Sequence, residues 1–197
     1  MADKITVPVG LKNIYYAKLI KDDESGVTYD TPKRLAPAIT ANITPSVNSA
    51  TLFAENGPLI TANALGEITV EIGVADIPFD IQAELLGMTV NSDGVLVDNA
   101  EDQAPEVALG FERNTEAGTS RFTWLLKGRF KLPNEEAKTA AGTPEFQTPT
   151  ISAVFLKRIF DGNWRFRVDS GSTGVKPEVI ANWFKEVYSG PAGTPKP

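Results

Sequence analysis

The chain has 197 residues, a formal net charge of −6 and a hydrophobic content of 42%, which is enough to build the core of one domain. It contains no cysteine and no histidine, which excludes disulfides, thiolate metal sites and catalysis of the Ser-His-Asp or Cys-His type. No apolar run is long enough to cross a membrane, and the first residues lack the pattern of a signal peptide. We therefore expect a globular protein that is made in a cytosol-like compartment and has no membrane partner.

Charge is unevenly distributed along the chain. From Leu35 to Glu112 there is no lysine or arginine but there are twelve carboxylates, so this middle block has a charge of −12 and the two flanks together hold +6. The acidic balance argues against nucleic-acid binding through a broad basic face. The block predicts either a solvated acidic face that keeps the protein soluble or a surface that repels polyanions.

The first fifty residues read as strand and loop. Asn13 to Ile20 is rich in β-branched and aromatic residues and predicts a strand, which the cluster Asp22 to Gly26 ends in a turn. Val27 to Tyr29 and Ile39 to Ile43 are also expected to be extended. Prolines in this part of the chain disfavour a long helix.

Residues 45–64 show neither a period of 2.0 nor one of 3.6, so we predict a long loop, and loops of this length are often functional. The candidate functional residues in this loop are Pro45, Val47, Leu52, Phe53, Glu55, Pro58 and Ile60.

The clearest strand is Glu67 to Ile72, which alternates strictly between apolar and polar residues. Ile68, Val70 and Ile72 are expected to face the core, with Glu67 and Glu71 on the other face. A short amphipathic helix from Ile77 to Leu86 follows, with Asp76 as its N-cap and Gly87 at its C-terminus. Asp80 and Glu84 lie one turn apart on the polar face of this helix, an arrangement that needs solvent or a basic partner.

An acidic and a basic strand are predicted to form a hairpin. Glu106 to Glu112 alternates, with Val107, Leu109 and Phe111 pointing inward and Glu106 and Glu112 pointing outward. The expected partner strand runs from Arg121 to Lys131 and carries the cations Arg121, Lys127, Arg129 and Lys131. Opposite charges on paired strands stabilise a sheet, so this pattern has a plain structural explanation as well as an interfacial one.

The last third of the chain contains two strands and a helix. Residues 132–149 are predicted to be a second exposed loop, and Ile151 to Phe160 with Trp164 to Val168 a hairpin turning at Asp161-Gly162. Pro177 begins a helix whose apolar stripe includes Trp183, and 190–197 is expected to be a flexible tail.

Together these elements predict a mainly β protein that forms a single domain over residues 1–197. Roughly eight strands indicate an antiparallel β-sandwich or partly closed barrel, with two short flanking α-helices packed on its outside.

Motifs of enzymes and metal sites are weak in this sequence. Glu67 and Glu71 have a spacing that suits paired acid/base carboxylates, but nothing nearby supplies a nucleophile or a base. Asn91 to Gly94 resembles part of a calcium loop but lacks the later glutamate, which favours a β-turn. We therefore predict no catalytic residues, no metal and no cofactor.

Several stretches, in the same order along the chain, resemble the major tail proteins of long-tailed bacteriophages of Gram-positive hosts. The segments that carry the resemblance span nearly the whole chain: residues 9–18, 22–29, 66–87, 101–105, 108–111, 146–150 and 182–184.

The resemblance implies a tail tube subunit: a β-sandwich protomer forming hexameric rings that stack into a hollow cylinder for DNA delivery. It implies further that the loop 45–64 is an arm reaching the adjoining ring. The expected partners are other copies of the chain, the tape measure protein, tail terminator or tail tip proteins, and DNA in transient passage. The expected location is the virion tail, assembled in the host cytoplasm.

The charge pattern fits such a conduit, because a lumen for DNA must not bind phosphate. Glu67, Glu71, Glu106 and Glu112 are the candidate acidic residues of the lumen or of a subunit contact. Arg121, Lys127, Arg129 and Lys131 are the candidate complementary basic face.

A carbohydrate-binding β-sandwich module of the virion is the alternative function. It requires exposed tryptophans, whereas Trp124, Trp164 and Trp183 all fall on apolar stripes that are more typical of a core.

Overall fold

The computed structural model describes residues 6–135, 138–139, 146 and 148–190. Its two helices are α1 (Phe79–Leu86) and α2 (Pro177–Asn182). Its strands are β1 (Pro8–Asp23), β2 (Gly26–Tyr29), β3 (Lys33–Arg34), β4 (Ala38–Ala54), β5 (Gly57–Val74), β6 (Thr89–Val90), β7 (Leu96–Val97), β8 (Val107–Thr115), β9 (Ser120–Phe130), β10 (Thr150–Leu156) and β11 (Arg165–Asp169). The predicted mainly β class with two short helices is confirmed.

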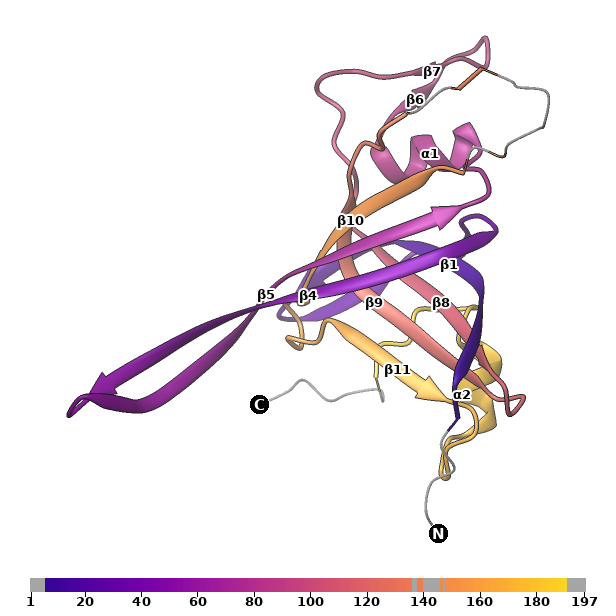
Figure 1. Ribbon diagram of the computed structural model, residues 1–197. Coiled ribbons are helices and arrows are strands. Elements are labelled where there is room, and N and C mark those ends of the chain that lie inside the picture. Colours follow the sequence, from indigo (N-terminus) through magenta and orange to yellow (C-terminus); the bar gives the residue numbers. More distant parts are fainter. Residues whose placement is uncertain (1–5, 136–137, 140–145, 147, 191–197) are drawn as a thin grey trace.

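Nine of these strands form one antiparallel sheet in the order β2-β1-β8-β9-β10-β5-β4, with β11 beside β9 and β3 beside β1. β6 and β7 form a separate pair. The sheet curves strongly, so that β1 and β4, which are not hydrogen-bonded neighbours, come into contact. The result is a partly closed barrel from which the ends of β4 and β5 extend as a long ribbon (Figure 1).

The main hydrophobic core lies on the concave side of this sheet. The predicted strand 67–72 is part of β5, and Ile68, Val70 and Ile72 are fully buried in the core. α1 packs on the same core and ends at Gly87, whose positive φ of 79° gives a left-handed cap. The helix begins at Phe79, so the predicted start at Ile77 and the Asp76 cap are wrong; Pro78 holds the N-cap position because its fixed φ suits the extended backbone there.

The polar face of α1 has the basic partner that its charge requires. Glu84 forms an ion pair with Lys33 at 2.6 Å and accepts a hydrogen bond from the Tyr16 hydroxyl at 2.9 Å. These contacts fasten α1 to β1 and β3 and so fix one end of the barrel.

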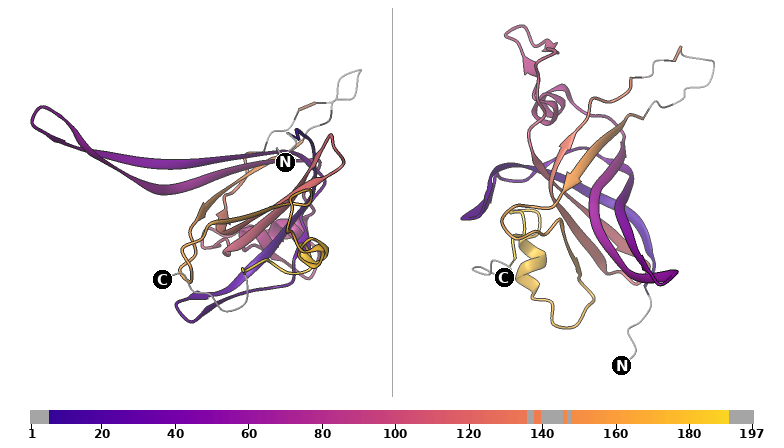
Figure 2. Two further views of the ribbon diagram at one scale, coloured as in Figure 1. Left: turned by 90° about the horizontal axis from the view of Figure 1, so that it is seen from below. Right: turned by 90° about the vertical axis from the view of Figure 1, so that its left-hand side faces the viewer.

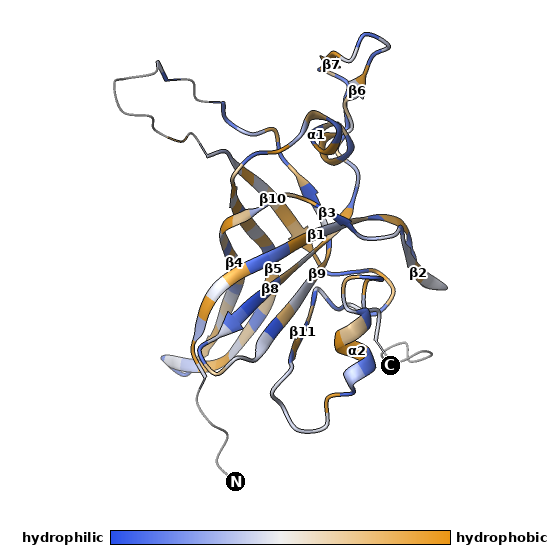
Figure 3. Ribbon diagram, turned by 90° about the vertical axis from the view of Figure 1, so that its right-hand side faces the viewer, coloured by the Kyte–Doolittle hydropathy of each residue, from blue (hydrophilic) through white to orange (hydrophobic). Residues whose placement is uncertain are grey.

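A second hydrophobic cluster lies on the convex side of β1, β8 and β9, where α2 and the residues after it cover the sheet. Ala108 and Trp124 are buried there against Trp183, and Figure 3 shows hydrophobic and hydrophilic residues both present along α2. β8 is therefore buried on both faces. Val107, Leu109 and Phe111 face the core as predicted, which leaves Glu112 on the other face, but its side chain is covered there instead of open to solvent. The predicted β8–β9 hairpin is confirmed, with Leu109 opposite Leu125.

A register shift in β9 explains how one strand serves both clusters. Leu109 pairs with Leu125 but Val107 pairs with Gly128, so β9 has an extra residue between them. The shift reverses which face each side chain uses, which places Trp124 in the convex cluster and Phe130 in the core.

The predicted hairpin of 151–160 with 164–168 is wrong. β10 pairs with β9 residues 127–130 and with β5, whereas β11 pairs with β9 residues 121–125. The two strands share one edge of β9 in succession, and the turn at 158–163 crosses from one to the other. The extra residue in β9 lies where β10 replaces β11 as the neighbouring strand, which is consistent with a strand that changes direction at a bulge.

The predicted loop at 45–64 is also wrong, because these residues continue β4 and β5 as a two-stranded antiparallel ribbon. We call residues 46–66 the arm. Its tip turns at Glu55 and Asn56, whose φ angles of 51° and 64° are those of a tight primed turn. Both faces of the arm are exposed, and this removes the period-2 pattern that a strand shows when one face is buried.

Of the predicted loop at 132–149, the described residues 132–135, 138–139, 146 and 148–149 form no helix or strand and are mostly exposed, and the other residues of this loop lie outside the described part. The predicted tail at 190–197 also lies outside it, apart from residue 190. No helix in the described part of the chain has the length and apolar character needed to span a membrane.

Candidate assembly surfaces

The arm exposes apolar side chains along its whole length. Residues with large exposed fractions include Phe53 at 67%, Leu59 at 62% and Ile60 at 60%. The left view of Figure 2 shows that the ribbon leaves the body with no other element packed against it. An isolated two-stranded ribbon is marginally stable in water, and many exposed apolar side chains on one element are typical of an interaction surface. Of the predicted residues, Val47, Leu52 and Glu55 lie with these in the arm, as does Pro58, while Pro45 lies at its base.

Few side-chain contacts hold the arm together. The hydroxyl of Ser49 donates to the side-chain oxygen of Asn63 at 2.7 Å, and the hydroxyls of Thr51 and Thr61 lie 3.1 Å apart across the ribbon. The arm is thus held by backbone pairing and by these side-chain hydrogen bonds, and it has no hydrophobic core of its own.

Glu67 and Glu71 lie on the convex face of β5, as the alternation predicts, and both are exposed. Asn42 of β4 and Ser152 of β10 flank Glu71 on the neighbouring strands. No ion pair to either glutamate is present in the described part of the chain, and α2 covers other strands. Among the described residues, this part of the sheet face is therefore left uncovered.

The other two predicted acidic residues are engaged within the chain. Glu112 is only 6% exposed, pairs with Lys12 at 3.1 Å and accepts a hydrogen bond from the Asn13 side chain. Glu106 lies between Lys127 at 3.6 Å and Arg129 at 3.5 Å. Glu67 and Glu71 therefore do not share one free acidic surface with Glu106 and Glu112.

The predicted basic residues are also divided. Arg121 pairs with Asp169 at 2.8 Å near one end of β9, while Lys127 and Arg129 meet Glu106 near the other. Lys131 follows β9, and its backbone N–H donates to Ser152. Opposite charges on the paired strands β8 and β9 thus do meet within one chain, in the contacts of Glu106 with Lys127 and Arg129.

A junction that the sequence analysis missed joins β1, β9 and the turn after β10. The Asp22 carboxylate lies 2.8 Å from the Lys127 ammonium and accepts the backbone N–H groups of Ile159 and Phe160. Burial opposes ionisation of Asp22, but the Ile159 N–H, Lys127 and the Phe160 N–H outweigh it and lower the pKa of this carboxyl below 3.8.

This lowered pKa predicts an acid-sensitive junction. A carboxyl whose pKa is lower in the folded state stabilises it fully above the unfolded pKa, so this stability is lost as pH falls from 3.8 towards the folded pKa. Urea unfolding at pH 7 and pH 3 is expected to show a smaller difference in unfolding free energy for Asp22→Asn than for the wild type. Asp98→Asn, at an exposed residue that forms no ion pair with any described cation, is the matched control, and an unchanged difference in Asp22→Asn would contradict the assignment.

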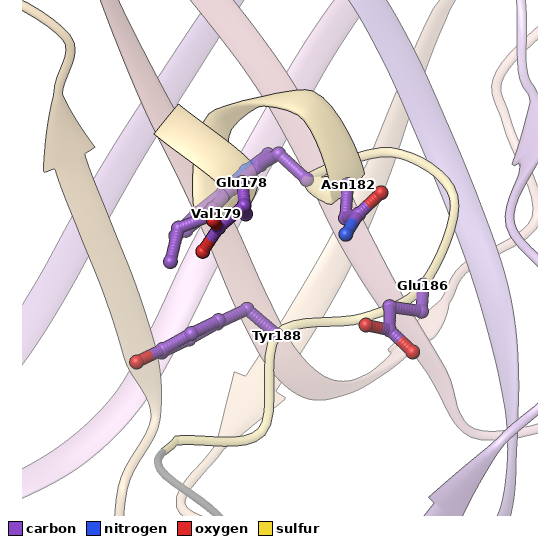
Figure 4. A pocket seen from close by; sticks show the side chains of 6 residues that line it. Glu178, Val179, Asn182, Glu186 and Tyr188 are labelled. Carbon is purple, nitrogen blue, oxygen red and sulfur yellow. The ribbon is translucent and has the colours of Figure 1, made fainter. Parts of the chain in front are cut away.

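The three tryptophans do not form an exposed platform. Trp124 and Trp183 are buried, and the Trp183 ring stacks on Tyr188 with centroids 5.4 Å apart. Trp164 is half-buried beneath the Arg165 guanidinium, 4.1 Å from its ring centroid. The pocket beside Trp183 is small, about 150 Å³, and the carboxylates of Glu178 and Glu186 lie at its sides (Figure 4). The carbohydrate-binding alternative thus lacks the exposed tryptophans that it requires.

The sequence matches the phage tail tube protein family over residues 10–162. The comparison with curated protein sequences gives no match. Among solved structures, the chain is similar to the tube-terminating cap of the anti-feeding prophage, determined by cryo-electron microscopy. The identity is 10%, the alignment covers 86% of this chain and 98% of that chain, and the TM-score is 0.46.

Proposed function

Since the chain belongs to the phage tail tube protein family, we propose that its copies form hexameric rings that stack into the tail tube, the conduit through which DNA reaches the host. In this role the protein is structural rather than enzymatic and is a component of the virion tail, assembled in the host cytoplasm.

The arm is the observation that carries this proposal. A ribbon with exposed apolar residues on strands that extend directly from the core is a costly feature for a protein that remains a monomer. Burying it on another copy removes apolar area from water and gives the ribbon the packing that it lacks. In the proposed assembly, the arm lies on a copy in the adjoining ring.

The exposed face with Glu67 and Glu71 is the proposed lining of the lumen. Carboxylates repel the phosphates of passing DNA and keep the wall from binding it. These residues have the exposure that a lining needs, whereas Glu106 and Glu112 are held by cations of the same chain.

Reversing the charge of this face is expected to slow DNA ejection without blocking assembly. Phage particles carrying Glu67→Lys/Glu71→Lys are expected to release DNA more slowly at low salt, because each lysine attracts phosphate, and the difference is expected to shrink as salt rises. The measurement is DNA release from purified particles over time. The matched control is Glu178→Lys/Glu186→Lys, two reversals near α2, and equal ejection by both variants would move the lumen away from β5.

The ends of the tube must meet different proteins, and we infer that these are the tape measure protein inside the tube and tail terminator or tail tip proteins at its ends. These contacts use the same surfaces that stack one ring on the next, since a terminal ring leaves those surfaces open.

Self-association is tested by multi-angle light scattering of the purified chain at rising concentration. The proposal predicts a mass that rises from the monomer through ring-sized species to polymers. A mass of one chain at every concentration, both alone and with a preformed tail tip added as initiator, would contradict it.

A further inference from the structure

Four arginines gather at one end of the barrel. Arg113 and Arg121 are opposite each other on β8 and β9, while Arg165 and Arg167 lie on β11 against Leu125 and Thr123 of β9. These residues line a groove of about 540 Å³, together with Thr123, Asp169 and aromatic side chains. We call it the arginine groove.

Only one of these cations is neutralised within the described residues. Arg121 pairs with Asp169 at 2.8 Å, whereas the side chains of Arg113, Arg165 and Arg167 form no ion pair or hydrogen bond there, and the Arg165 guanidinium lies over the Trp164 ring. The Nε of Arg113 is buried without a hydrogen-bond partner. Burial, together with the charges of Arg121 and Arg167, lowers the pKa of Arg113. Crowded cations with an unsatisfied buried donor indicate a surface that is completed by an anionic partner.

Carboxylates without cations gather at the other end of the molecule. The segment 91–102, which we call the acidic loop, carries Asp93, Asp98, Glu101 and Asp102 and has no basic residue. Asp93, Asp98 and Glu101 are exposed, and no described cation pairs with any of the four. Val95 and Val97 of the same loop are 54% and 44% exposed, so the loop offers both carboxylates and apolar side chains.

The two charged regions cannot meet within one chain. The acidic loop leads directly into the start of β8, and Arg113 lies near the end of that strand, seven residues beyond Glu106, which corresponds to roughly 23 Å. Figure 1 shows β6, β7 and α1 at one end of the barrel, and β11 with the β8–β9 turn at the opposite end. The protomer therefore has an acidic end and an arginine end.

We propose that the arginine groove binds the acidic loop of a second copy of the chain, in the contact by which one ring stacks on the next. A contact between two different surfaces of identical chains repeats from copy to copy, and it builds an open filament where the rotation between copies does not close a ring. The opposite charges at the two ends also fix the polarity of the stack, since two arginine ends or two acidic ends repel. This inference rests on the proposed tube assembly and adds to it the partner of a surface apart from the arm.

Charge reversal tests the contact. Arg165→Glu/Arg167→Glu is expected to reduce the yield of tubes by about tenfold or more, because like charges then face each other across the interface. Asp98→Arg/Glu101→Arg is expected to have the same effect from the other side, and it changes only an exposed loop. Combining all four substitutions in one chain is expected to restore tubes. The matched control is Lys157→Glu/Lys185→Glu, which makes the same change in net charge at two exposed lysines outside the groove.

A cross-link gives a readout that does not depend on charge. The natural chain has no cysteine, so Ala100→Cys/Arg167→Cys introduces one thiol in the acidic loop and one in the groove. Oxidation of assembled protein is expected to produce a ladder of disulfide-linked chains, because a disulfide requires Cα atoms within about 7 Å. The pair Ala100→Cys/Lys157→Cys is expected to remain monomeric on a denaturing gel.

The outcomes separate this inference from the proposed function. Three results would each overturn the inference while leaving the tube in place. The first is normal tubes from Arg165→Glu/Arg167→Glu. The others are a chain with all four substitutions that forms no tubes although the lysine control does, and the absence of a cross-linked ladder. Failure of the wild type to polymerise would instead overturn the proposed function. Circular dichroism of each variant identifies misfolding. If the groove variant misfolds, the tube yield of Asp98→Arg/Glu101→Arg, which changes only an exposed loop, tests the contact instead.

Discussion

Removing the arm is expected to leave a folded protein that no longer assembles. Val47 and Leu65 are paired across the ribbon, so residues 48–64 can be replaced by Asn-Gly, a two-residue sequence that closes an antiparallel hairpin. The core residues of β5 lie beyond this point and are unaffected. Burying two apolar side chains of the arm contributes about 3 kcal/mol, which corresponds to roughly a hundredfold in the protein concentration needed for assembly.

The truncated chain is compared with the wild type by sedimentation at rising concentration. Phe53→Asp/Ile60→Asp, which keeps the length of the arm but not its apolar surface, is expected to act in the same direction. Phe53→Leu/Ile60→Val is the conservative control and is expected to assemble normally. Tubes from the truncated chain at the wild-type concentration would show that the arm is not an assembly element.

A buried ion pair is expected to carry the largest stability effect in the body of the protein. Arg158 is 1% exposed, and its guanidinium meets the Asp161 carboxylate through its Nε at 3.0 Å and through Nη2. The ring of Phe166 lies 5.4 Å from the guanidinium carbon. Burial opposes ionisation of Asp161, but hydrogen bonds from Arg158 and Asn163 outweigh it and lower the pKa of this carboxyl.

Removing one partner leaves the other charge buried alone. Arg158→Ala is therefore expected to reduce the unfolding free energy by about 3–5 kcal/mol, measured by urea unfolding at pH 7. The neighbouring exposed lysine gives the matched control Lys157→Ala, which is expected to change it by less than about 0.5 kcal/mol. Arg158→Met/Asp161→Leu is expected to be more stable than Arg158→Ala, because no buried charge remains. A loss below about 1 kcal/mol in Arg158→Ala would mean that water reaches the site.

Elements with one buried face could be predicted from the sequence. Glu67 to Ile72 alternates because Ile68, Val70 and Ile72 enter the core, and the β8–β9 hairpin follows from the same rule. The left-handed end of α1 at Gly87 follows from the conformational freedom of glycine.

Elements that depart from this rule could not be predicted in the same way. The arm has no buried face, so it lacks the contrast between alternate residues, whereas β8 alternates in sequence although both of its faces are buried. The pairing of β10 and β11 with different parts of β9 depends on a register shift that no local pattern reveals. The Asn56-Gly57 dipeptide at the tip of the arm was an available signal for a hairpin.

For the surface residues, too, exposure could be predicted where it follows from local alternation but not where it depends on other strands. The exposure of Glu67 and Glu71 came from the alternation of β5, while the engagement of Glu106 and Glu112 depended on Lys127, Arg129 and Lys12 from other strands. The arginine groove was missed because Arg113 and Arg165 are far apart in the sequence and meet only through the pairing of β8, β9 and β11.

Negative-stain electron microscopy of the purified chain at rising concentration is the most direct test of the tail tube assignment. Annular rings are expected at low concentration and hollow tubes of constant width at high concentration, with neither formed by the chain that lacks residues 48–64. Uniform monomers at every concentration, with a tail tip complex present as initiator, would contradict it.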